Sequence, residues 1–272
     1  MQCKPAFELA AWLEQALPAD DRFDRIMQLQ GEVFRDVPGR KTVRVTLGGR
    51  SCFVKQHFGV GWAEIFKNLF SGKWPVLTAR TEWDAIRKLG ELGIATTPAL
   101  GYGVRGCNPA RLQSFLITQD LGDIVSLETL CADWKNKPPP AGFKRKLLIQ
   151  VAGLARRLHE GGMNHRDFYI CHICLDKPAL AKGELLLYLI DLHRVGIRRT
   201  IRPSDRMKDL AALYFSAMEA GLSERDYLRF LRHYRQQSLK TLGNEHDFWQ
   251  RVTRRAAKLY LKFHGKMPAT TM

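Results

Sequence analysis

Two acidic residues follow apolar segments in an order that strongly restricts the fold. An apolar helical pattern over residues 144–159 ends before the pair Gly161-Gly162. A polar loop then carries His165-Arg166-Asp167, and a β-branched and leucine-rich segment ends at a second carboxylate, Asp191. A helix, a His-Arg-Asp loop, a strand and an Asp, in this order, are typical of the catalytic half of a phosphotransferase.

The composition fits a globular chain with one large core or two lobes. The chain has 272 residues, of which 45% are hydrophobic, enough for two lobes of roughly 100 to 150 residues each. No segment approaches the ~18 consecutive apolar residues of a membrane span, and residues 1–18 carry charges where a signal peptide would be apolar. We therefore expect a cytoplasmic protein.

The six cysteines are scattered, which favours reduced thiols in a reducing compartment. Only Cys171-His172-Ile173-Cys174 has a spacing typical of metal ligands. One Cys-x-x-Cys without a second pair is a weak zinc signal, so we interpret these cysteines as small buried hydrophobes.

The charge is strongly basic, with 43 Lys and Arg against 27 Asp and Glu and a formal net charge of +16. Much of the excess lies beyond Arg198. The partner surface is therefore expected to be anionic: nucleic acid, phospholipid headgroups, a phosphorylated glycolipid or an acidic protein. The chain shows no helix-turn-helix, RNA-recognition or zinc-finger signature, so we do not expect nucleic acid as the partner.

The first lobe is predicted to contain a five-stranded antiparallel sheet with helices. Residues 5–17 have an amphipathic helical pattern that ends at Pro18. Segments with the alternation and flanking turns of strands are residues 32–37, 42–47, 51–56, 97–103 and 114–119. A helix is predicted over residues 79–92.

Residues 119–123 are predicted to link this lobe, residues 1–121, to a mostly helical lobe, residues 122–272. The helices expected there, besides a short one from Ser126, cover residues 144–159, 208–215, 224–234 and 245–263. The predicted class is therefore α+β with a bilobal, protein-kinase-like fold. We assign nucleotide binding to the first lobe, and catalysis with acceptor binding to the second.

Lys55 and Glu82 are the candidates for binding ATP in the first lobe. Lys55 lies on the third predicted strand, and Glu82 on the helix that follows could hold it over the α- and β-phosphates. The turn at residues 38–42 has neither the Gly-x-Gly-x-x-Gly of protein kinases nor a P-loop. Taken alone, Lys55 would be interpreted as a solvated lysine. Its interpretation as a phosphate ligand depends on the motifs that follow later in the chain.

Residues 62–70 form an aromatic helical stripe between these two candidates. Its apolar side chains recur with helical spacing, which usually indicates a helix packed on its own lobe. Contact with a membrane or an acyl chain is the alternative.

The second lobe supplies the candidate catalytic and metal-binding groups. Asp167 would accept the proton of a substrate hydroxyl, while His165 and Arg166 keep the loop in shape. Asp191 would be an oxygen ligand of Mg²⁺. His172 stands five residues after Asp167, where protein kinases place a metal-binding Asn, so we expect it at the cofactor and metal site as well.

Several motifs closely resemble the lipopolysaccharide core heptose I kinases, over almost the whole chain. They are Phe53-Val54-Lys55, residues 61–69, Pro75-Val76-Leu77-x-Ala79-Arg80-x-Glu82, residues 164–172, Ile190-Asp191-Leu192-His193-Arg194 and residues 208–216. The resemblance implies a protein-kinase-like fold and ATP- and Mg²⁺-dependent phosphorylation of O-4 on the first inner-core heptose. It also implies that Asp167 is the catalytic residue.

The resemblance further implies particular partners. The acceptor would be a lipid-anchored, anionic oligosaccharide at the cytoplasmic face of the inner membrane, which suits a basic enzyme that lies on the membrane surface. Acylated acyl carrier protein is also expected, and its acidity would match the charge of this chain.

Two other classes remain as alternatives. One is a related kinase for Kdo or another small molecule, although a cationic, aminoglycoside-like substrate is disfavoured by the charge. The other is a basic binding protein or an inactive kinase fold, which the presence of Lys55, Asp167 and Asp191 disfavours.

Overall fold

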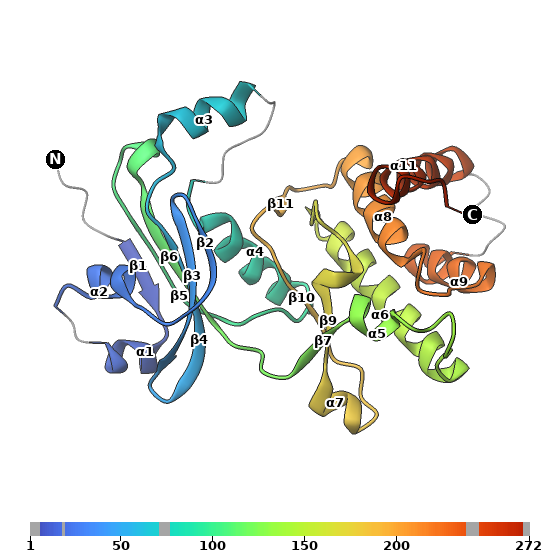
Figure 1. Cartoon of the computed structure of the whole chain (residues 1–272), viewed down its shortest axis with the longest axis horizontal. Helices are drawn as coiled ribbons and strands as arrows, with labels where there is room; N and C mark the ends of the chain where they lie inside the picture. The colour runs from blue at the N-terminus through green and yellow to red at the C-terminus, as the bar shows by residue number, and fades with distance from the viewer. Residues whose placement is uncertain (1–5, 18–19, 71–76, 238–244, 269–272) are drawn as a thin grey trace. The chain divides into compact units, whose positions relative to one another are not determined.

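The computed structural model describes residues 6–17, 20–70, 77–237 and 245–268, which form two compact units (Figure 1). The first unit comprises residues 1–88 and 97–121, and the second comprises residues 89–96 and 122–272. Pro18 and the Pro75-Val76 pair, which figured in the sequence analysis, lie outside the described residues. No helix in the described part is long and apolar enough to cross a membrane.

The first unit is built on an antiparallel sheet of six strands in the order β1-β5-β6-β4-β3-β2. The strands are β1 (Ala6–Leu9), β2 (Glu32–Val37), β3 (Arg40–Leu47), β4 (Arg50–His57), β5 (Ala99–Arg105) and β6 (Gln113–Gln119). The expected antiparallel sheet is confirmed, with one strand more than predicted.

The extra strand, β1, corrects the prediction of one helix over residues 5–17. Residues 6–9 pair with β5, and only α1 (Ala11–Ala16) is helical. The apolar residues Phe7 and Leu9 fit an alternating strand as well as they fit a helix. Their partners in β5 lie 90 or more residues away along the chain, so the local sequence pattern does not reveal this pairing.

One face of this sheet is covered by α1 and α2 (Arg22–Gln28). Leu13 of α1 and Phe23 and Ile26 of α2 are buried in one core with the sheet. In β4, Cys52 and Val54 point into this core. Gln56 points the same way and donates to the carbonyls of Ile26 and Leu29 at 2.9 and 3.2 Å. Because side chains alternate along a strand, Lys55 faces away from this core.

Two further helices belong to the strand connections of the first unit. α3 (Gly61–Phe70) follows β4 and packs near the short 3₁₀ helix η1 (Pro109–Arg111). α4 (Arg80–Glu91) begins where the backbone N–H of Ala79 donates to the buried Ser114 hydroxyl of β6 at 3.0 Å. This bond fixes the start of α4 against the sheet.

The second unit is mostly helical, as predicted. Its helices are α5 (Leu127–Cys131), α6 (Ala141–Glu160), η2 (Ile170–His172), α7 (Lys177–Ala181), α8 (Pro203–Ala217), α9 (Glu224–Arg235) and α11 (His246–His264). α6 packs against α9, and α8 packs against α11. The long apolar pattern that precedes the His-Arg-Asp loop is therefore α6.

Five short strands in the described part of the second unit support its loops. They are β7 (Ile124–Ser126), β8 (Met163–Asn164), β9 (Ile173–Asp176), β10 (Leu187–Leu189) and β11 (Gly196–Ile197). β10, β9 and β7 form one antiparallel sheet, and β11 pairs with β8. Gly162 precedes β8 with a φ of 76°, and an added Cβ would lie 2.0 Å from the Arg198 carbonyl oxygen. Only glycine fits where these two segments meet.

The cysteines differ in part from the expectation of reduced thiols. Cys52, Cys131, Cys171 and Cys174 are free, as expected. Cys107 is disulfide-bonded, so the expectation is wrong at this position. Disulfide formation depends on the distance between two cysteines in the folded chain, which their spacing in the sequence does not report.

Candidate active site

The His-Arg-Asp loop is held by one buried carboxylate, that of Asp209 on α8. Asp209 is 1% exposed. Its oxygens accept the backbone N–H groups of His165 at 2.6 Å and Arg166 at 2.9 Å. Arg166 has a φ of 70°, a left-handed conformation that costs a non-glycine residue about 1 kcal/mol or more. The two bonds from Asp209 stabilise this turn immediately before Asp167.

A chain of buried polar groups supports Asp209 from behind. Nε2 of His159 on α6 lies 3.4 Å from Asp209, and Nδ1 of His159 lies 2.8 Å from the Tyr234 hydroxyl on α9. Burial raises the pKa of Tyr234, which keeps its hydroxyl protonated. Tyr234 is thus hydrogen-bonded to His159, and His159 to Asp209. Three helices are thereby joined to the His-Arg-Asp loop.

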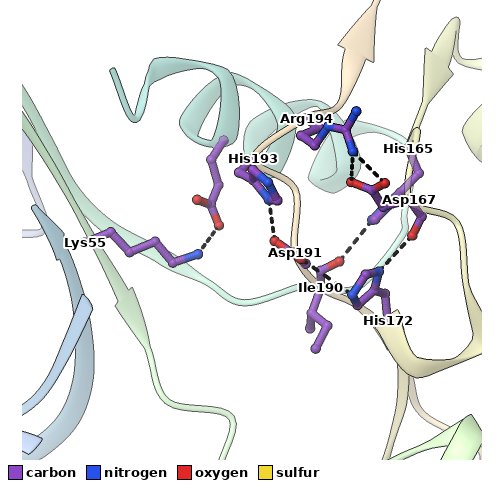
Figure 2. A network of polar contacts seen from close by, with 9 residues as sticks. Lys55, His165, Asp167, His172, Ile190, Asp191, His193 and Arg194 are labelled. Carbon is purple, nitrogen blue, oxygen red and sulfur yellow. Dashed lines mark hydrogen bonds and ion pairs between the residues drawn. The ribbon is translucent and has the colours of Figure 1, made fainter. Parts of the chain in front are cut away.

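His165 is a structural member of the loop. Its ring is fully buried, and Nε2 donates to the carbonyl of Ile190 at 2.9 Å (Figure 2). Burial lowers its pKa, so the ring is neutral near pH 7. Its Nδ1 has no hydrogen-bond partner within the described residues. His165 thus ties the loop to the segment that ends in Asp191.

Asp167 is presented at the surface of the second unit, where Arg194 is its cationic partner among the described residues. Nη1 of Arg194 donates to both of its oxygens, at 2.8 and 3.0 Å (Figure 2). The Asp167 side chain is 18% exposed and that of Arg194 is 47% exposed. Asp167 is thus open to a substrate hydroxyl once this partner moves.

Asp191 lies between two histidines. One oxygen is hydrogen-bonded to Nδ1 of His193, and the other lies 3.5 Å from Nε2 of His172 (Figure 2). Asp191 also has a φ of 62°, a strained value for a residue other than glycine. Strain of this kind persists where the surrounding structure fixes it, and it is common at functional sites.

His172 is positively charged near pH 7. Its pKa is raised to about 9, chiefly by a hydrogen bond with the Cys171 side chain and, among lesser causes, by the Asp167 carbonyl and the Asp191 charge. Its Nδ1 donates to that carbonyl at 2.7 Å. In this form His172 is an ion-pair partner of Asp191. A metal could use its Nε2 only after the proton has left, so its role as a metal ligand stays a prediction.

Lys55 and Glu82 form an ion pair within the first unit. Lys55 points away from the α1–α2 core, and Glu82 of α4 is hydrogen-bonded to it. The Glu82 side chain is 7% exposed and that of Lys55 is 29% exposed. The lysine, oriented by a buried carboxylate, offers its remaining donors outward, as a phosphate-binding lysine must.

The described residues contain no cluster of three or more His, Cys, Asp or Glu side chains that could enclose a metal. Zinc at the Cys171–Cys174 segment therefore has no support within these residues. Mg²⁺ does not need such a cluster, since it is commonly bound by one or two carboxylates together with substrate phosphates and waters. Asp191 fits this donor set.

Sequence reasoning missed several residues that the structure brings to the site. Arg194 and His193 contact the two key carboxylates directly, and His159 and Tyr234 support Asp209. The signal for the first two was their place two and three residues after Asp191. For His159 and Tyr234 the sequence held no such signal, because they come from separate helices.

The antiparallel sheet with its Lys55–Glu82 pair, and the helical unit with its anchored His-Arg-Asp loop, define a phosphotransferase of the protein-kinase-like class. Residues 24–234 match the lipopolysaccharide kinase (Kdo/WaaP) family. The chain belongs to this family, and the predicted class of ATP-dependent kinase is confirmed.

Curated relatives support the same assignment. A protein of Pseudomonas aeruginosa named lipopolysaccharide core heptose(I) kinase WaaP is 48% identical over 88% of this chain and 90% of its own length. A protein of the same name from Escherichia coli K12 is 46% identical over 79% of this chain and 81% of its own length. The resemblance to heptose I kinases is thereby confirmed.

A solved structure confirms the fold. It is described as WaaP in complex with acyl carrier protein, is 41% identical to this chain and superposes with a TM-score of 0.80. The match covers 94% of this chain and 99% of the other.

Replacement of Asp209 by Ala is predicted to damage both stability and catalysis. It would leave the N–H groups of His165 and Arg166 buried without an acceptor, at a cost of about 3 kcal/mol in the free energy of unfolding. Urea unfolding and turnover measure the two effects, and Asp209→Asn, which keeps one acceptor oxygen, should lose less stability. Asp123→Ala, which removes an exposed carboxylate, is the control. Unchanged stability of Asp209→Ala would refute the anchoring role.

Proposed function

We propose that this protein phosphorylates O-4 of the first heptose of the lipopolysaccharide inner core, using ATP and Mg²⁺. The single observation that carries the proposal is the placement of Asp167. Its carboxylate projects from a loop that is locked by buried Asp209, in a chain close in sequence to proteins named as core heptose I kinases. A sugar hydroxyl is the chemical group that such a carboxylate can activate.

The residues of the second unit have distinct roles in this proposal. Asp167 accepts a hydrogen bond from the acceptor hydroxyl, aligns its oxygen and takes its proton late in the transfer. His165 and Arg166 maintain the turn that presents Asp167. Bound ATP and Mg²⁺ supply the transferable phosphoryl group and the positive charge that its oxygens require.

Asp191 is proposed as the metal ligand of the second unit, because its carboxylate is a hard oxygen donor. His172 and His193 orient it through their contacts with its two oxygens. His172 keeps Asp191 charge-balanced in the absence of a divalent cation, and a second role as a ligand requires its neutral form.

Residues 1–121 are proposed as the nucleotide-binding lobe and residues 122–272 as the catalytic and acceptor-binding lobe. In the first lobe, Lys55 is the phosphate ligand and Glu82 orients it. The turn at Pro38-Gly39 is also fixed, since the Phe58 N–H donates to the Gly39 carbonyl at 2.9 Å. A rigid turn of this kind can cover phosphates without a glycine-rich sequence.

Acylated acyl carrier protein is proposed as a partner. A cavity of about 90 Å³ lies among α5, α6, α8, α9 and α11 in the second unit, and its lining is almost wholly apolar. Residues that line it include Trp134, Val151, Leu213, Ala220, Leu231 and Val252. One water-sized sphere needs about 10–15 Å³ of such space, so the cavity has room for several methylene groups. The solved relative in complex with acyl carrier protein supports this partner.

The exposure of its side chains changes the interpretation of the aromatic stripe on residues 62–70. Only Ile65 of this stripe is buried, whereas Trp62, Phe66 and Leu69 are about half exposed and Phe70 is 90% exposed. The interpretation as core therefore holds for Ile65 alone. We propose that the exposed face of α3 rests on the cytoplasmic surface of the inner membrane, where aromatic side chains and a basic protein both bind favourably.

The first test of the proposed function is transfer from labelled ATP to a core saccharide with or without heptose. Label in heptose-containing core only is the expected result. Equal transfer to a core that contains only Kdo would favour the alternative acceptor.

Asp167→Ala is predicted to lower turnover by roughly 10²- to 10⁴-fold. The melting temperature should change little, because Asp167 is a loop carboxylate whose partly exposed ion pair contributes about 1 kcal/mol or less. Asp167→Asn, of the same shape, should be equally inactive. A folded Asp167→Ala protein with near wild-type turnover would exclude Asp167 as the catalytic residue.

Filling the apolar cavity by Ala220→Phe is predicted to weaken binding of acylated acyl carrier protein by about tenfold or more. Each methylene group of the acyl chain that is no longer buried costs ~0.8 kcal/mol, so the loss of a few of them is enough for this effect. Calorimetry with acylated and unacylated carrier protein measures this. Binding of the unacylated form should not change. Ala181→Phe, on the exposed end of α7, is the control. Equal affinity of Ala220→Phe and wild type for the acylated form would show that the acyl chain binds outside this cavity.

The double variant Phe66→Asp, Leu69→Asp is predicted to reduce activity on lipid-linked acceptor in vesicles several-fold more than activity on soluble core saccharide. Both side chains are exposed, so the fold should tolerate the change. Leu186→Asp with Leu228→Asp places the same charges on exposed apolar positions of the second unit as a control. Equal losses on both acceptors would contradict membrane contact through α3.

A further inference from the structure

Arg194 occupies the atoms of Asp167 that the reaction needs. Its Nη1 donates to both carboxylate oxygens, at 2.8 and 3.0 Å. An acceptor hydroxyl must hydrogen-bond to one of these oxygens before its proton can move there. Arg194 and the acceptor hydroxyl therefore compete for the same two oxygens, and opening of the ion pair gives the hydroxyl full access to them.

Structural support of the loop does not explain this ion pair. The loop is already held by buried Asp209, whereas Arg194 and Asp167 are partly exposed, at 47% and 18% of their side chains. Exposed pairs of this type contribute about 1 kcal/mol or less. Opening the pair is therefore easy when another anion can replace Asp167 as the partner of Arg194.

The free part of the guanidinium is suited to such an anion. Nε and Nη2 of Arg194 make no hydrogen bond or ion pair within the described residues, and the fork of an arginine matches a carboxylate or a phosphate. A second cation lies nearby: Arg194 and Arg255 of α11 both act to lower the pKa of Tyr169, against the larger rise caused by burial. Arg255 is exposed and has no ion-pair partner in the described part.

Tyr169 completes this surface with an aromatic ring. It follows Asp167 by two residues, is half-buried and contacts Phe215 edge to face with centroids 6.2 Å apart. An aromatic ring flanked by arginines, with a catalytic carboxylate beside it, is a suitable environment for a sugar that carries acidic groups.

We propose that Arg194 determines acceptor specificity: it pairs with Asp167 in the free enzyme and transfers to an acidic group of the bound acceptor saccharide, which frees Asp167 for the hydroxyl. This inference rests on the proposed function, since it concerns the acceptor of the same reaction. The acidic group is a carboxylate of a sugar acid or a phosphate next to the phosphorylated sugar. The protein thereby couples recognition of an anionic acceptor to release of its own catalytic base.

The test compares wild type and Arg194→Gln on three forms of one soluble core saccharide: intact, carboxyl-reduced and dephosphorylated. Wild type should show a KM for acceptor about tenfold or more higher for the form that lacks the recognised acid, the usual effect of losing a charge-assisted hydrogen bond. Arg194→Gln should have that raised KM already with intact acceptor, with no further increase on neutralisation. The KM for ATP should stay unchanged.

Two variants make the comparison specific. Arg254→Ala removes a neighbouring exposed charge on α11 and should leave every KM unchanged. Arg194→Lys keeps the charge without the fork and should give an intermediate KM.

Two results would overturn the proposal. One is an equal rise in KM for charged and neutral acceptors in Arg194→Gln. The other is a fall in kcat with all KM values unchanged, which would limit Arg194 to a local effect on Asp167. The position of the phosphate in the wild-type product is determined separately. A product phosphorylated elsewhere than on heptose would contradict the proposed function, while the comparison of variants remains valid for whichever saccharide is phosphorylated.

Discussion

The candidate site depends on the buried carboxylate of Asp209, which accepts two consecutive backbone N–H groups of the His-Arg-Asp loop. A left-handed turn at Arg166 is unfavourable by itself, and a charged acceptor in a low-dielectric interior offsets that cost. His159 and Tyr234 satisfy and orient the carboxylate in turn. The position of Asp167 is therefore set by the packing of α6, α8 and α9, and the polar loop contributes little to it.

Much of the fold and half of the site could be predicted from the sequence, for physical reasons that are visible in particular elements. Strand alternation in residues 51–56 forces Lys55 to the face opposite Cys52 and Val54, and the helical period of α4 brings Glu82 within reach. Such local periodicities can be recognised in the amino-acid sequence. The order of His165-Arg166-Asp167 and Asp191 along the chain likewise predicts which segments carry the candidate catalytic groups.

Contacts made only in the folded chain escaped prediction. β1 owes its strand conformation to β5, and Cys107 owes its disulfide to the fold. Arg194 follows Asp191 closely in sequence, yet its contact with Asp167 depends on how two loops meet, 27 residues apart along the chain. The positive φ of Asp191 is also a property of its surroundings, because aspartate tolerates this conformation more often than most residues but does not require it.

The charge and the apolar surfaces together suit a kinase whose acceptor is anionic and lipid-linked. The net charge of +16 attracts such an acceptor, and Arg194 places part of that charge beside Asp167. The central claim is that Asp167 directs phosphate to O-4 of the first heptose. Fragmentation mass spectrometry and phosphorus NMR of the core saccharide after incubation with ATP and Mg²⁺ test it most directly. We predict one phosphate on O-4 of that heptose, and a phosphate on another sugar, or none, would contradict the account.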